Sequence, residues 1–202
     1  MGIIMASMFT TIDGVYQAPG APDEDPSGGF AHGGWQAPFA EAESGAEILA
    51  DIDRLDALLL GRRTYDIFAA YWPAFGDSNP IAVKFNAVPK FVASRTLTEP
   101  AWAGTEVLTD AAEQAGALRD RFERVHVIGS GDLLRTLLDA GVVDELKLWV
   151  YPVALGSGKR LFDGAMPATY SLAGPPRKYA SGAFSVIYSP AGPVVVGEMG
   201  PE

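Results

Sequence analysis

The chain contains no cysteine and only two histidines, His32 and His126. Without cysteine there can be no disulfide bond, no thiolate nucleophile and no zinc site built on cysteine. With so few histidines, a histidine-rich metal site is not expected either. The sequence therefore predicts a protein that needs no metal ion for its fold or its chemistry.

Basic residues and long apolar runs are also scarce. The chain has 15 Lys and Arg against 25 Asp and Glu, a net charge of −10. Nucleic-acid binders usually carry a basic face, so that class of function is disfavoured. No apolar run approaches the ~20 residues that a membrane span requires. The N-terminal "GIIMASMF" is too short for a signal core and follows no Lys or Arg. We expect a soluble, cytoplasmic protein with a small-molecule partner and neither a nucleic-acid nor a membrane partner.

The composition itself is that of a globular protein. Hydrophobic residues make up 48% of the chain and charged residues 20%, which argues against disorder. A chain of 202 residues can bury a full hydrophobic core. No repeat, low-complexity tail or linker divides it, so we predict one domain that covers residues 1–202.

Apolar strands alternate with segments of helical spacing along most of the chain. Strands are predicted at 3–10, 57–61, 89–94, 105–108, 124–129 and 144–153, and helices at 47–56, 62–72, 111–122 and 132–141. Asp110 is expected to cap the third helix and Gly141 to end the fourth. Alternating patterns at 179–190 and 193–199 predict closing antiparallel strands. The fold class is therefore α/β, with a mixed, mostly parallel sheet flanked by helices and antiparallel C-terminal edge strands.

Polar residues and glycines follow three of the predicted strands. In open α/β sheets, ligands bind beyond the carboxyl ends of the strands, so these residues should converge. They are Arg62, Arg63 and Thr64 after "ALLLG", Ser94 and Arg95 after "FVA", and Gly129, Ser130, Gly131, Asp132 and Leu133 after "HVI".

Their chemistry suits an anionic ligand. A helix N-terminus offers free N–H groups, glycine lets the backbone approach closely, and arginine forms a fork for phosphate oxygens. A Ser-Arg pair at a neighbouring strand end suits an isolated phosphate, such as the ribose 2′-phosphate of NADPH. Each feature alone also has a purely structural interpretation, as a chain reversal or a solvated helix face. The glycine turn is neither a GxGxxG fingerprint nor a P-loop.

Residues 11–40 form a long segment rich in glycine and proline. Long ordered loops inside compact domains are usually functional. Phe30, Trp35 and Phe39 suggest that the segment packs down, and His32 lies between aromatic residues. Trp35 and Phe39 could cover a flat ring, or they could hold the loop in place. His32 could form a structural hydrogen bond or contact the substrate. We expect the loop to form one wall of a ligand cavity. His126, in the middle of a predicted strand, is expected to pack against a helix.

Four segments together resemble a known family. They are "TTIDG" (10–14), "LLLGRRTYDIFAAYWP", "PKFVASRTL" and "VIGSGDLLRTLLDAGVVDELKLWVYPVALGSGKRLF". They resemble the dihydrofolate-reductase-like superfamily and, more narrowly, the C-terminal reductase domain of the bifunctional riboflavin-biosynthesis deaminase/reductase. In "TTIDG", Thr11 takes the place of the serine in the family's Ser-x-Asp-Gly segment.

The resemblance implies an NADPH-dependent reductase that acts on a small, heterocyclic substrate, and a homodimer. Arg62, Arg63 and Thr64 would match the pyrophosphate-binding helix start, Ser94 and Arg95 the 2′-phosphate contacts, and Gly129 to Leu133 the second glycine turn. Asp13 and Gly14, with Thr11 beside them, would lie where nicotinamide meets substrate. Asp13 is the candidate catalytic residue, and Thr11, Gly14, His32 and Trp35 are the candidate substrate-binding residues.

The chain departs from the family pattern at one position of the glycine turn. The riboflavin reductase usually has glutamate where this chain has Gly129. Dihydrofolate reductase itself has an acidic residue on its first helix, for which Glu47, Asp51 and Asp53 are candidates by position. Two alternatives stay open: the 5-amino-6-(5-phosphoribosylamino)uracil reductase of riboflavin biosynthesis, and a non-catalytic dinucleotide-binding module. A flavin-type cofactor in place of NADPH also stays open.

Overall fold

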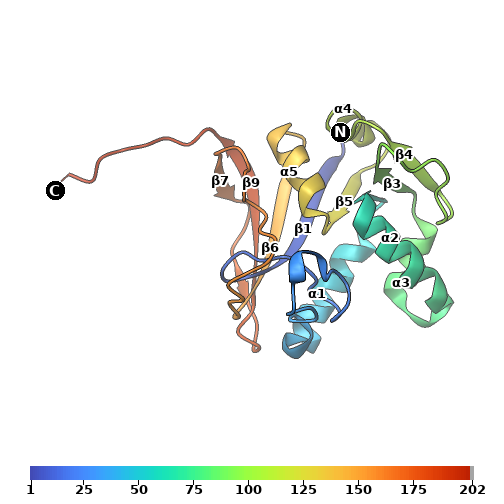
Figure 1. Ribbon diagram of the computed structural model, residues 1–202. Helices are drawn as coiled ribbons and strands as arrows, with labels where there is room; N and C mark the ends of the chain where they lie inside the picture. Colours follow the sequence, from blue (N-terminus) through green and yellow to red (C-terminus); the bar gives the residue numbers. More distant parts are fainter. Residues whose placement is uncertain (201–202) are drawn as a thin grey trace.

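The computed structural model describes residues 1–200, and every strand in this range belongs to one nine-stranded sheet (Figure 1). The strand order is β4-β3-β2-β5-β1-β6-β9-β7, and β8 pairs with β9. The strands are β1 (Ile3–Thr11), β2 (Ala57–Gly61), β3 (Lys90–Ala93), β4 (Thr105–Leu108), β5 (Arg124–Ile128), β6 (Glu145–Tyr151), β7 (Thr169–Leu172), β8 (Arg177–Lys178) and β9 (Phe184–Gly192).

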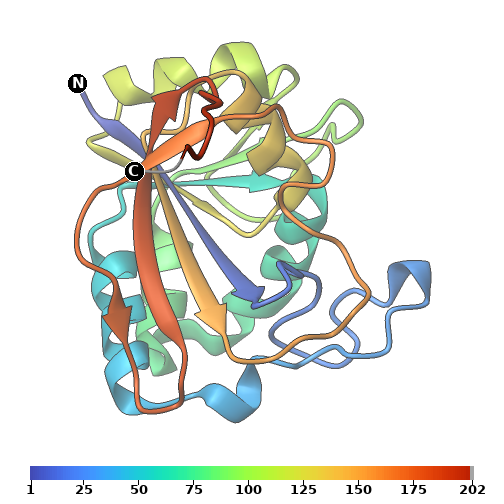
Figure 2. The same ribbon diagram turned by 90° about the vertical axis from the view of Figure 1, so that its left-hand side faces the viewer.

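The six strands from β4 to β6 are all parallel, and β7, β8 and β9 join the sheet antiparallel. Figure 2 shows β1 and β6 pointing the same way, with β9 running beside β6. The predicted fold class, a mixed and mostly parallel sheet with antiparallel edge strands, is confirmed. Because the parallel strands share one direction, their carboxyl ends meet at one edge of the sheet.

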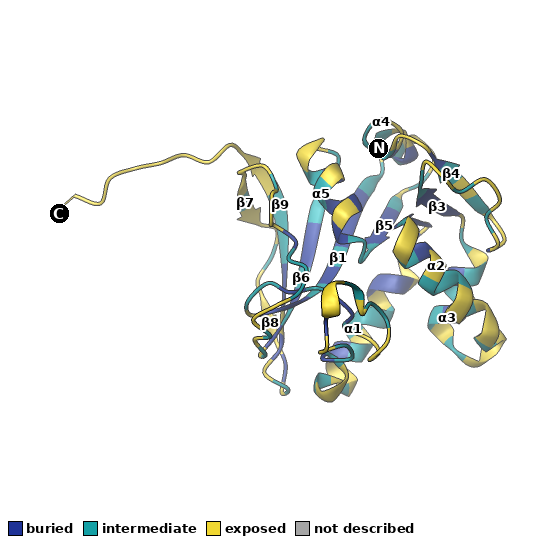
Figure 3. Ribbon diagram, in the orientation of Figure 1, coloured by how far each residue is buried: buried dark blue, intermediate teal, exposed yellow. Residues whose placement is uncertain are grey.

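Helices cover both faces of the sheet. The α-helices are α1 (Ala42–Asp53), α2 (Arg62–Tyr71), α3 (Pro80–Ala87), α4 (Ala111–Gln114) and α5 (Gly131–Asp139). Short 3₁₀ helices are η1 (Ser27–Gly29), η2 (Ala37–Phe39), η3 (Trp72–Ser78) and η4 (Gly116–Asp120). One core cluster joins the sheet to α4, η4 and α5, and another joins it to α1, α2 and α3. Figure 3 shows the buried strands between these two layers.

Successive side chains of β5 point to opposite faces of the sheet, as a strand requires. Val125 and Val127 belong to the core under α5, whereas Ile128 packs in the core on the side of α1 to α3. His126 therefore faces the side of α1 to α3. It lies between Met5 of β1 and Leu58 of β2 in the register of the sheet.

Several predicted boundaries need correction. The helix predicted at 47–56 is α1, which begins and ends earlier, and the helix predicted at 111–122 is split into α4 and η4. Helix α3 was not predicted, although Asn79 caps it by accepting hydrogen bonds from the backbone N–H groups of Ile81 and Ala82. The predicted caps are confirmed: Asp110 accepts from the N–H of Glu113, and Gly141, with φ of 67°, follows α5.

The C-terminal segment differs most from its prediction. Residues 193–199 were expected to form a strand, but they contain no helix or strand and extend away from the sheet (Figure 1). The side chains of Val195 and Val196 are exposed. An apolar run cannot form a strand without a neighbour to pair with, and the sheet here ends at β7. Within residues 1–200, no helix is both long and apolar enough to cross a bilayer.

Candidate functional site

A large cavity of about 1160 Å³ opens at the carboxyl ends of the parallel strands. All ten residues that the sequence predicted to meet at the strand ends line it: Arg62, Arg63, Thr64, Ser94, Arg95, Gly129, Ser130, Gly131, Asp132 and Leu133. They come from three separate segments of the chain. The structure therefore brings them together as the topology of the sheet requires.

Two helix N-termini meet at this edge through a single hydrogen bond. The hydroxyl of Ser130, the residue before α5, accepts from the backbone N–H of Gly61, the residue before α2, at 2.8 Å. Ser130 itself has a left-handed backbone, with φ of 62° and ψ of 56°. This strained conformation directs the serine toward the neighbouring strand end instead of its own helix. The N–H groups at the starts of α2 and α5 thus lie on one rim of the cavity.

The ring of Tyr16 packs on Gly131. A β-carbon added at Gly131 would lie 2.1 Å from Cζ of Tyr16, closer than any contact can be. Burial and the nearby charge of Asp132 raise the pKa of the Tyr16 hydroxyl to about 12, so this side chain is neutral. The glycine was expected to admit a phosphate. In the structure it admits the tyrosine from the long loop.

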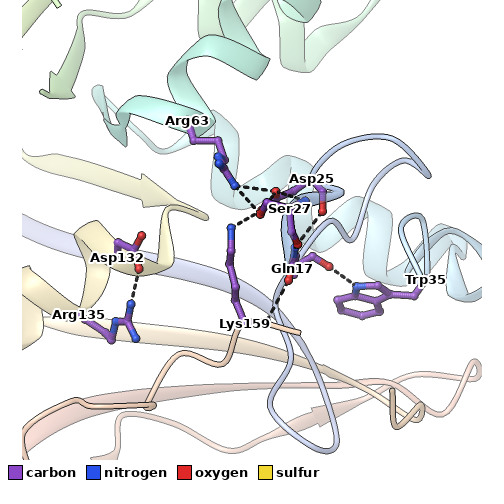
Figure 4. A network of polar contacts seen from close by, with 8 residues as sticks. All are labelled: Gln17, Asp25, Ser27, Trp35, Arg63, Asp132, Arg135 and Lys159. Carbon is purple, nitrogen blue, oxygen red and sulfur yellow. Dashed lines mark hydrogen bonds and ion pairs between the residues drawn. The ribbon is translucent and has the colours of Figure 1, made fainter. Parts of the chain in front are cut away.

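Arg63 is held by the long loop rather than being free. Its Nη1 donates to Oδ1 of Asp25 at 2.6 Å and to the hydroxyl of Ser27 at 2.9 Å. Nζ of Lys159 donates to the other oxygen of Asp25 at 2.6 Å (Figure 4). Burial alone would raise the pKa of Asp25, but the hydrogen bonds from Lys159, Ser27 and Arg63 outweigh it and lower the pKa to about 2. Asp25 therefore stays charged and links two cations of the cavity.

Gln17 fixes the loop around this ion pair. Its Nε2 donates to the carbonyl oxygens of Asp25 and Ser27, both at 2.9 Å, and its Oε1 accepts from the backbone N–H of Lys159 at 3.1 Å. The indole N–H of Trp35 donates to the carbonyl oxygen of Gln17 at 2.8 Å (Figure 4). The loop is thus an ordered part of the cavity wall. The lining residues that it contributes are Tyr16, Gln17, Ala18, Pro19, Gly20, Glu24, Asp25 and Gln36.

The other predicted phosphate contacts differ in how they are engaged. Arg62 pairs with Asp66 one turn along α2, and the hydroxyl of Ser94 accepts from the backbone N–H of Leu97 at 3.1 Å. Asp132 pairs with Arg135 on α5. Arg95 is exposed and forms no ion pair within residues 1–200. It is the lining arginine whose guanidinium has no acidic partner in this part of the chain.

Asp13 does not line the cavity, contrary to its predicted place beside nicotinamide and substrate. Its carboxylate accepts hydrogen bonds from the hydroxyl of Thr11, from the backbone N–H groups of Leu155 and Gly156, and from Arg160. The bond from Thr11 is the largest cause that lowers the pKa of Asp13 to about 2. The structure therefore shows Asp13 as an anchor between the end of β1 and the segment after β6.

The other predicted substrate contacts also lie outside the cavity. Gly14, with φ of 80°, completes the turn after β1. His32 is exposed and meets the ring of Phe30 edge-on at 5.8 Å. Trp35 is buried in a cluster with Phe30 and Tyr151. Of the two interpretations of these loop residues, the geometry favours packing of the loop against the sheet.

A buried ionic cluster beneath α1 was not predicted. Nζ of Lys147 lies 2.5 Å from both Oε1 of Glu47 and Oδ2 of Asp51, and the hydroxyl of Tyr179 donates to Oε2 of Glu47 at 2.7 Å. Of the three acidic candidates on this helix, only Asp51 lines the cavity, and Asp53 is exposed. Lys147 is the one basic residue within the apolar run of β6. A lysine at such a position indicates a buried ion pair, so the sequence contained a signal for this cluster.

The body of the cavity reaches under α1 and α2, where the sequence offered only the acidic candidates Glu47, Asp51 and Asp53. His126, Asp51 and Trp72 line this part together with apolar side chains of the three helices. His126 had been expected to pack against a helix without contacting a ligand. The position of His126 on a strand does not predict that α1, α2 and α3 leave a cavity next to it.

Comparison with known proteins identifies the family. The family model described as "RibD C-terminal domain" matches residues 3–174. An uncharacterized protein of Bacillus subtilis, YyaP, is 26% identical over 141 residues, which cover 68% of this chain and 75% of that protein.

Solved structures share the fold at low sequence identity. A putative riboflavin biosynthesis protein from Shewanella sp. PV-4 superposes with a TM-score of 0.64 at 19% identity, over 94% of this chain and 99% of that one. A pyrimidine reductase-like protein from Corynebacterium diphtheriae gives 0.62 at 14% identity, over 94% and 92% of the two chains. A deaminase/reductase from Thermotoga maritima gives 0.62 at 13% identity, over 94% of this chain and 57% of that one.

Proposed function

The chain belongs to the RibD C-terminal domain family, and on that premise we propose that it is an NADPH-dependent oxidoreductase of a small, heterocyclic substrate. The observation that carries the proposal is the meeting of ten predicted strand-end residues on one cavity of about 1160 Å³. Binding cavities for single drug-sized ligands span roughly 300–1,000 Å³. This one has room for a dinucleotide and a second small molecule.

The residues of the rim fit the phosphates of a dinucleotide. The starts of α2 and α5 offer backbone N–H groups and the positive ends of two helix dipoles. Ser94 and Arg95 would hold the ribose 2′-phosphate, and Arg62, Arg63 and Thr64 the pyrophosphate. When bound, NADPH supplies the hydride. The protein binds and orients the cofactor, and it excludes water from the reacting atoms.

The long loop would cover the site at the strand ends. Because Asp25 ties it to Arg63 and Lys159, the loop is held over the same rim that would receive the phosphates. A phosphate of the cofactor would compete with Asp25 for Arg63. We infer that binding releases this contact while Gln17 continues to hold the base of the loop.

A second candidate function is the reduction of a phosphoribosylamino-pyrimidine. It is favoured by the Thermotoga maritima neighbour, whose name includes 5-amino-6-(5-phosphoribosylamino)uracil reductase. Against it stand Gly129 in place of a glutamate and the pairing of Lys159 with Asp25, which engages the one lysine that lines the cavity within residues 1–200. A third hypothesis is a non-catalytic dinucleotide-binding module. Only a test of turnover distinguishes this module from the proposed oxidoreductase.

The decisive experiment measures binding and turnover separately. NADPH binding is titrated by the fluorescence of the reduced nicotinamide, and its oxidation is followed by absorbance with a panel of pyrimidines, pteridines and small carbonyl compounds. Oxidation that depends on one class of substrate supports the reductase. Tight binding without oxidation by any compound supports the binding module, and failure to bind NADPH refutes both.

We also propose a homodimer. The edge formed by β7 and β9 exposes Leu172 and Phe184, and the segment before β7 exposes Phe162 and Met166. The aromatic residues of β6, by contrast, are buried, because β6 lies between β1 and β9. An exposed apolar edge favours pairing with another chain.

A further inference from the structure

Helices α2 and α5 both begin at the rim of the cavity without a side-chain cap. Ser130 holds the capping position of α5, but its hydroxyl accepts from the backbone N–H of Gly61 instead of from its own helix. The first N–H groups of a helix have no acceptor within the helix. The side chains that lie in front of these two helix starts therefore decide whether an anion can reach them.

The ring of Tyr16 lies directly in front of α5. A β-carbon built on Gly131 would be 2.1 Å from Cζ, 2.3 Å from the hydroxyl oxygen and 2.5 Å from Cε1 of this ring. These distances leave no space for even a methyl group between the ring and the glycine. A phosphate is larger than a methyl group, so it cannot approach Gly131 from this side while the ring stays in place.

The backbone around Tyr16 is fixed. The N–H of Tyr16 donates to the carbonyl oxygen of Lys159 at 3.0 Å, and Val15 pairs with Arg160 in an isolated bridge. The side chain of Tyr16 itself is partly exposed and lines a cavity of about 1160 Å³. The ring can thus leave Gly131 by rotation of its own side chain, without any movement of the strand end that carries it.

Asp25 lies in front of α2 in a comparable way. Its carboxylate joins Arg63, in the first turn of α2, to Lys159 (Figure 4). A carboxylate shares with a phosphate its negative charge and its ability to accept two hydrogen bonds from an arginine fork. Asp25 therefore takes a position at Arg63 that a phosphate of a ligand could take.

The two contacts belong to one loop and lie against two helix starts that are fixed to each other. Gln17 follows Tyr16 directly and donates to the carbonyl oxygen of Asp25 at 2.9 Å. The hydrogen bond of 2.8 Å between Ser130 and Gly61 joins the two helix starts. One loop thus covers both halves of the rim, with an aromatic ring over α5 and a carboxylate at α2.

We propose that Tyr16 and Asp25 are internal substitutes for the cofactor, which keep the rim closed until its phosphates displace them. The ring of Tyr16 rotates away from Gly131, and Asp25 releases Arg63, so that the pyrophosphate can reach both helix starts. The apparent affinity is then lower than that of an open rim, in proportion to the fraction of chains whose rim is open. The inference rests on the proposed binding of NADPH, and it adds that Tyr16 controls access to α5.

The test replaces Tyr16 and also follows its ring directly. Tyr16→Ala removes the ring, and Tyr16→Leu keeps an apolar side chain that is too short to reach Gly131. Tyr16→Phe is the matched control, because it keeps the ring carbons that lie over the glycine. Binding of NADPH and of inorganic pyrophosphate is measured by calorimetry. The protein is labelled with 3-fluorotyrosine, and the one of its seven ¹⁹F signals that Tyr16→Phe lacks belongs to Tyr16.

We expect Tyr16→Ala and Tyr16→Leu to bind NADPH about threefold or more tighter than the wild type, because the closed fraction is lost, and Tyr16→Phe to stay within about twofold. In the wild type, NADPH should shift the ¹⁹F signal of Tyr16. Melting temperatures show which of the variants are folded. If neither Tyr16→Ala nor Tyr16→Leu folds, the ¹⁹F measurement on the wild type decides.

Two results would overturn the inference. One is that NADPH binds to the wild type and leaves the ¹⁹F signal of Tyr16 unchanged. The other is that Tyr16→Ala and Tyr16→Leu, when folded, bind NADPH no more tightly than the wild type does. If NADPH binds to none of the proteins, the proposed reductase fails, and pyrophosphate decides the role of Tyr16. A shift of the Tyr16 signal by pyrophosphate then supports that role, and no shift overturns it.

Discussion

The ring of Tyr16 lies so close to Gly131 that a β-carbon at residue 131 would sit 2.1 Å from the Cζ atom of the tyrosine. The contact joins the long loop to the first turn of α5. Its consequence is that the glycine is required even before any ligand is considered. A side chain at residue 131 and the ring of Tyr16 cannot both keep their places.

Replacement of Gly131 by alanine should therefore destabilise the fold by about 1–3 kcal/mol, the usual cost of inserting atoms into a packed site. A Tyr16→Ala substitution in the same chain should recover much of that loss, because it removes the atoms that clash. Urea unfolding of the two single variants and the double variant measures the coupling. Additive effects would show that the ring and the glycine do not constrain each other.

Arg95 should distinguish NADPH from NADH. A hydrogen bond between charged groups contributes roughly 1.5–3 kcal/mol, so Arg95→Ala should weaken NADPH binding about tenfold or more and leave NADH nearly unchanged. Arg62→Ala is the matched comparison: a pyrophosphate contact is common to both cofactors, so this change should weaken NADPH and NADH binding alike. Equal affinities of the wild type for NADPH and NADH would contradict the proposal that Ser94 and Arg95 bind the ribose 2′-phosphate.

Asp25 should restrain both the loop and the cations it holds. Asp25→Ala frees Arg63 and Lys159 from their shared partner, so we expect higher affinity for NADPH and faster proteolysis within residues 18–34. Limited proteolysis and fluorescence titration measure the two effects. Glu106→Ala, which breaks an exposed pair with Arg121 outside the cavity, should change neither. Unchanged proteolysis would show that Gln17 and Trp35 alone hold the loop.

His126 should make stability depend on pH. Burial lowers its pKa from 6.5 to about 4; Asp51 partly opposes this shift, and Arg124, Lys147 and Arg54 add to it. Since the unfolded chain binds the proton more readily, the histidine lowers stability as pH falls from 6.5 towards 4, by roughly 1.4 kcal/mol per pH unit at most. Above pH 6.5 it contributes no slope.

Urea unfolding of the wild type and of His126→Met across this range isolates the effect, since all other groups titrate in both proteins. The difference in unfolding free energy should shift progressively in favour of the variant below pH 6.5. His32→Gln, which replaces an exposed histidine, should follow the wild type. Parallel curves for the wild type and His126→Met would show that the buried imidazole does not resist protonation.

The exposed edge of the sheet should mediate dimer formation. Sedimentation at micromolar concentration should show a species of twice the 21.4 kDa chain mass. Leu172→Lys, on the edge strand β7, should shift the protein towards monomer, and Val83→Lys, at an exposed apolar site on α3, should not. A wild type that sediments only as a 21.4 kDa species contradicts the prediction.

The parts of the fold that could be predicted are those with a strong local signal. Strand 57–61 and the helix after it could be predicted because an apolar run ends at Gly61 and is followed by the charged start of a helix. The sequence also carries a start signal for helix α3, because Asn79, a good N-cap residue, is followed by proline. The strand predicted at 193–199 is wrong because the apolar sequence suits a strand, but no neighbouring strand is available for it to pair with. The order of the whole sheet decides this, and a local pattern does not contain it.

The candidate site divides in the same way. The strand-end residues could be found because parallel topology alone brings them together. The pairing of Asp25 with Lys159, 134 residues apart, could not, since no local pattern records it. The position of Asp13 outside the cavity lining could not be predicted either: the family resemblance puts it beside the nicotinamide, whereas its hydrogen bonds with Leu155 and Gly156 depend on the tertiary fold.

The hydrogen bond between Ser130 and Gly61 lies at the end of the cavity that tolerates fewer substitutions. The Ser130 hydroxyl accepts from the backbone N–H of Gly61 and fixes the starts of α2 and α5 against each other, so the rim, where we propose that the cofactor binds, depends on main-chain geometry and on this one serine. The region around His126 is instead defined by side chains on the bodies of strands and helices. These can be exchanged one at a time without moving the rim. A descendant of this protein could thus acquire a new substrate while keeping the rim to which we assign the cofactor.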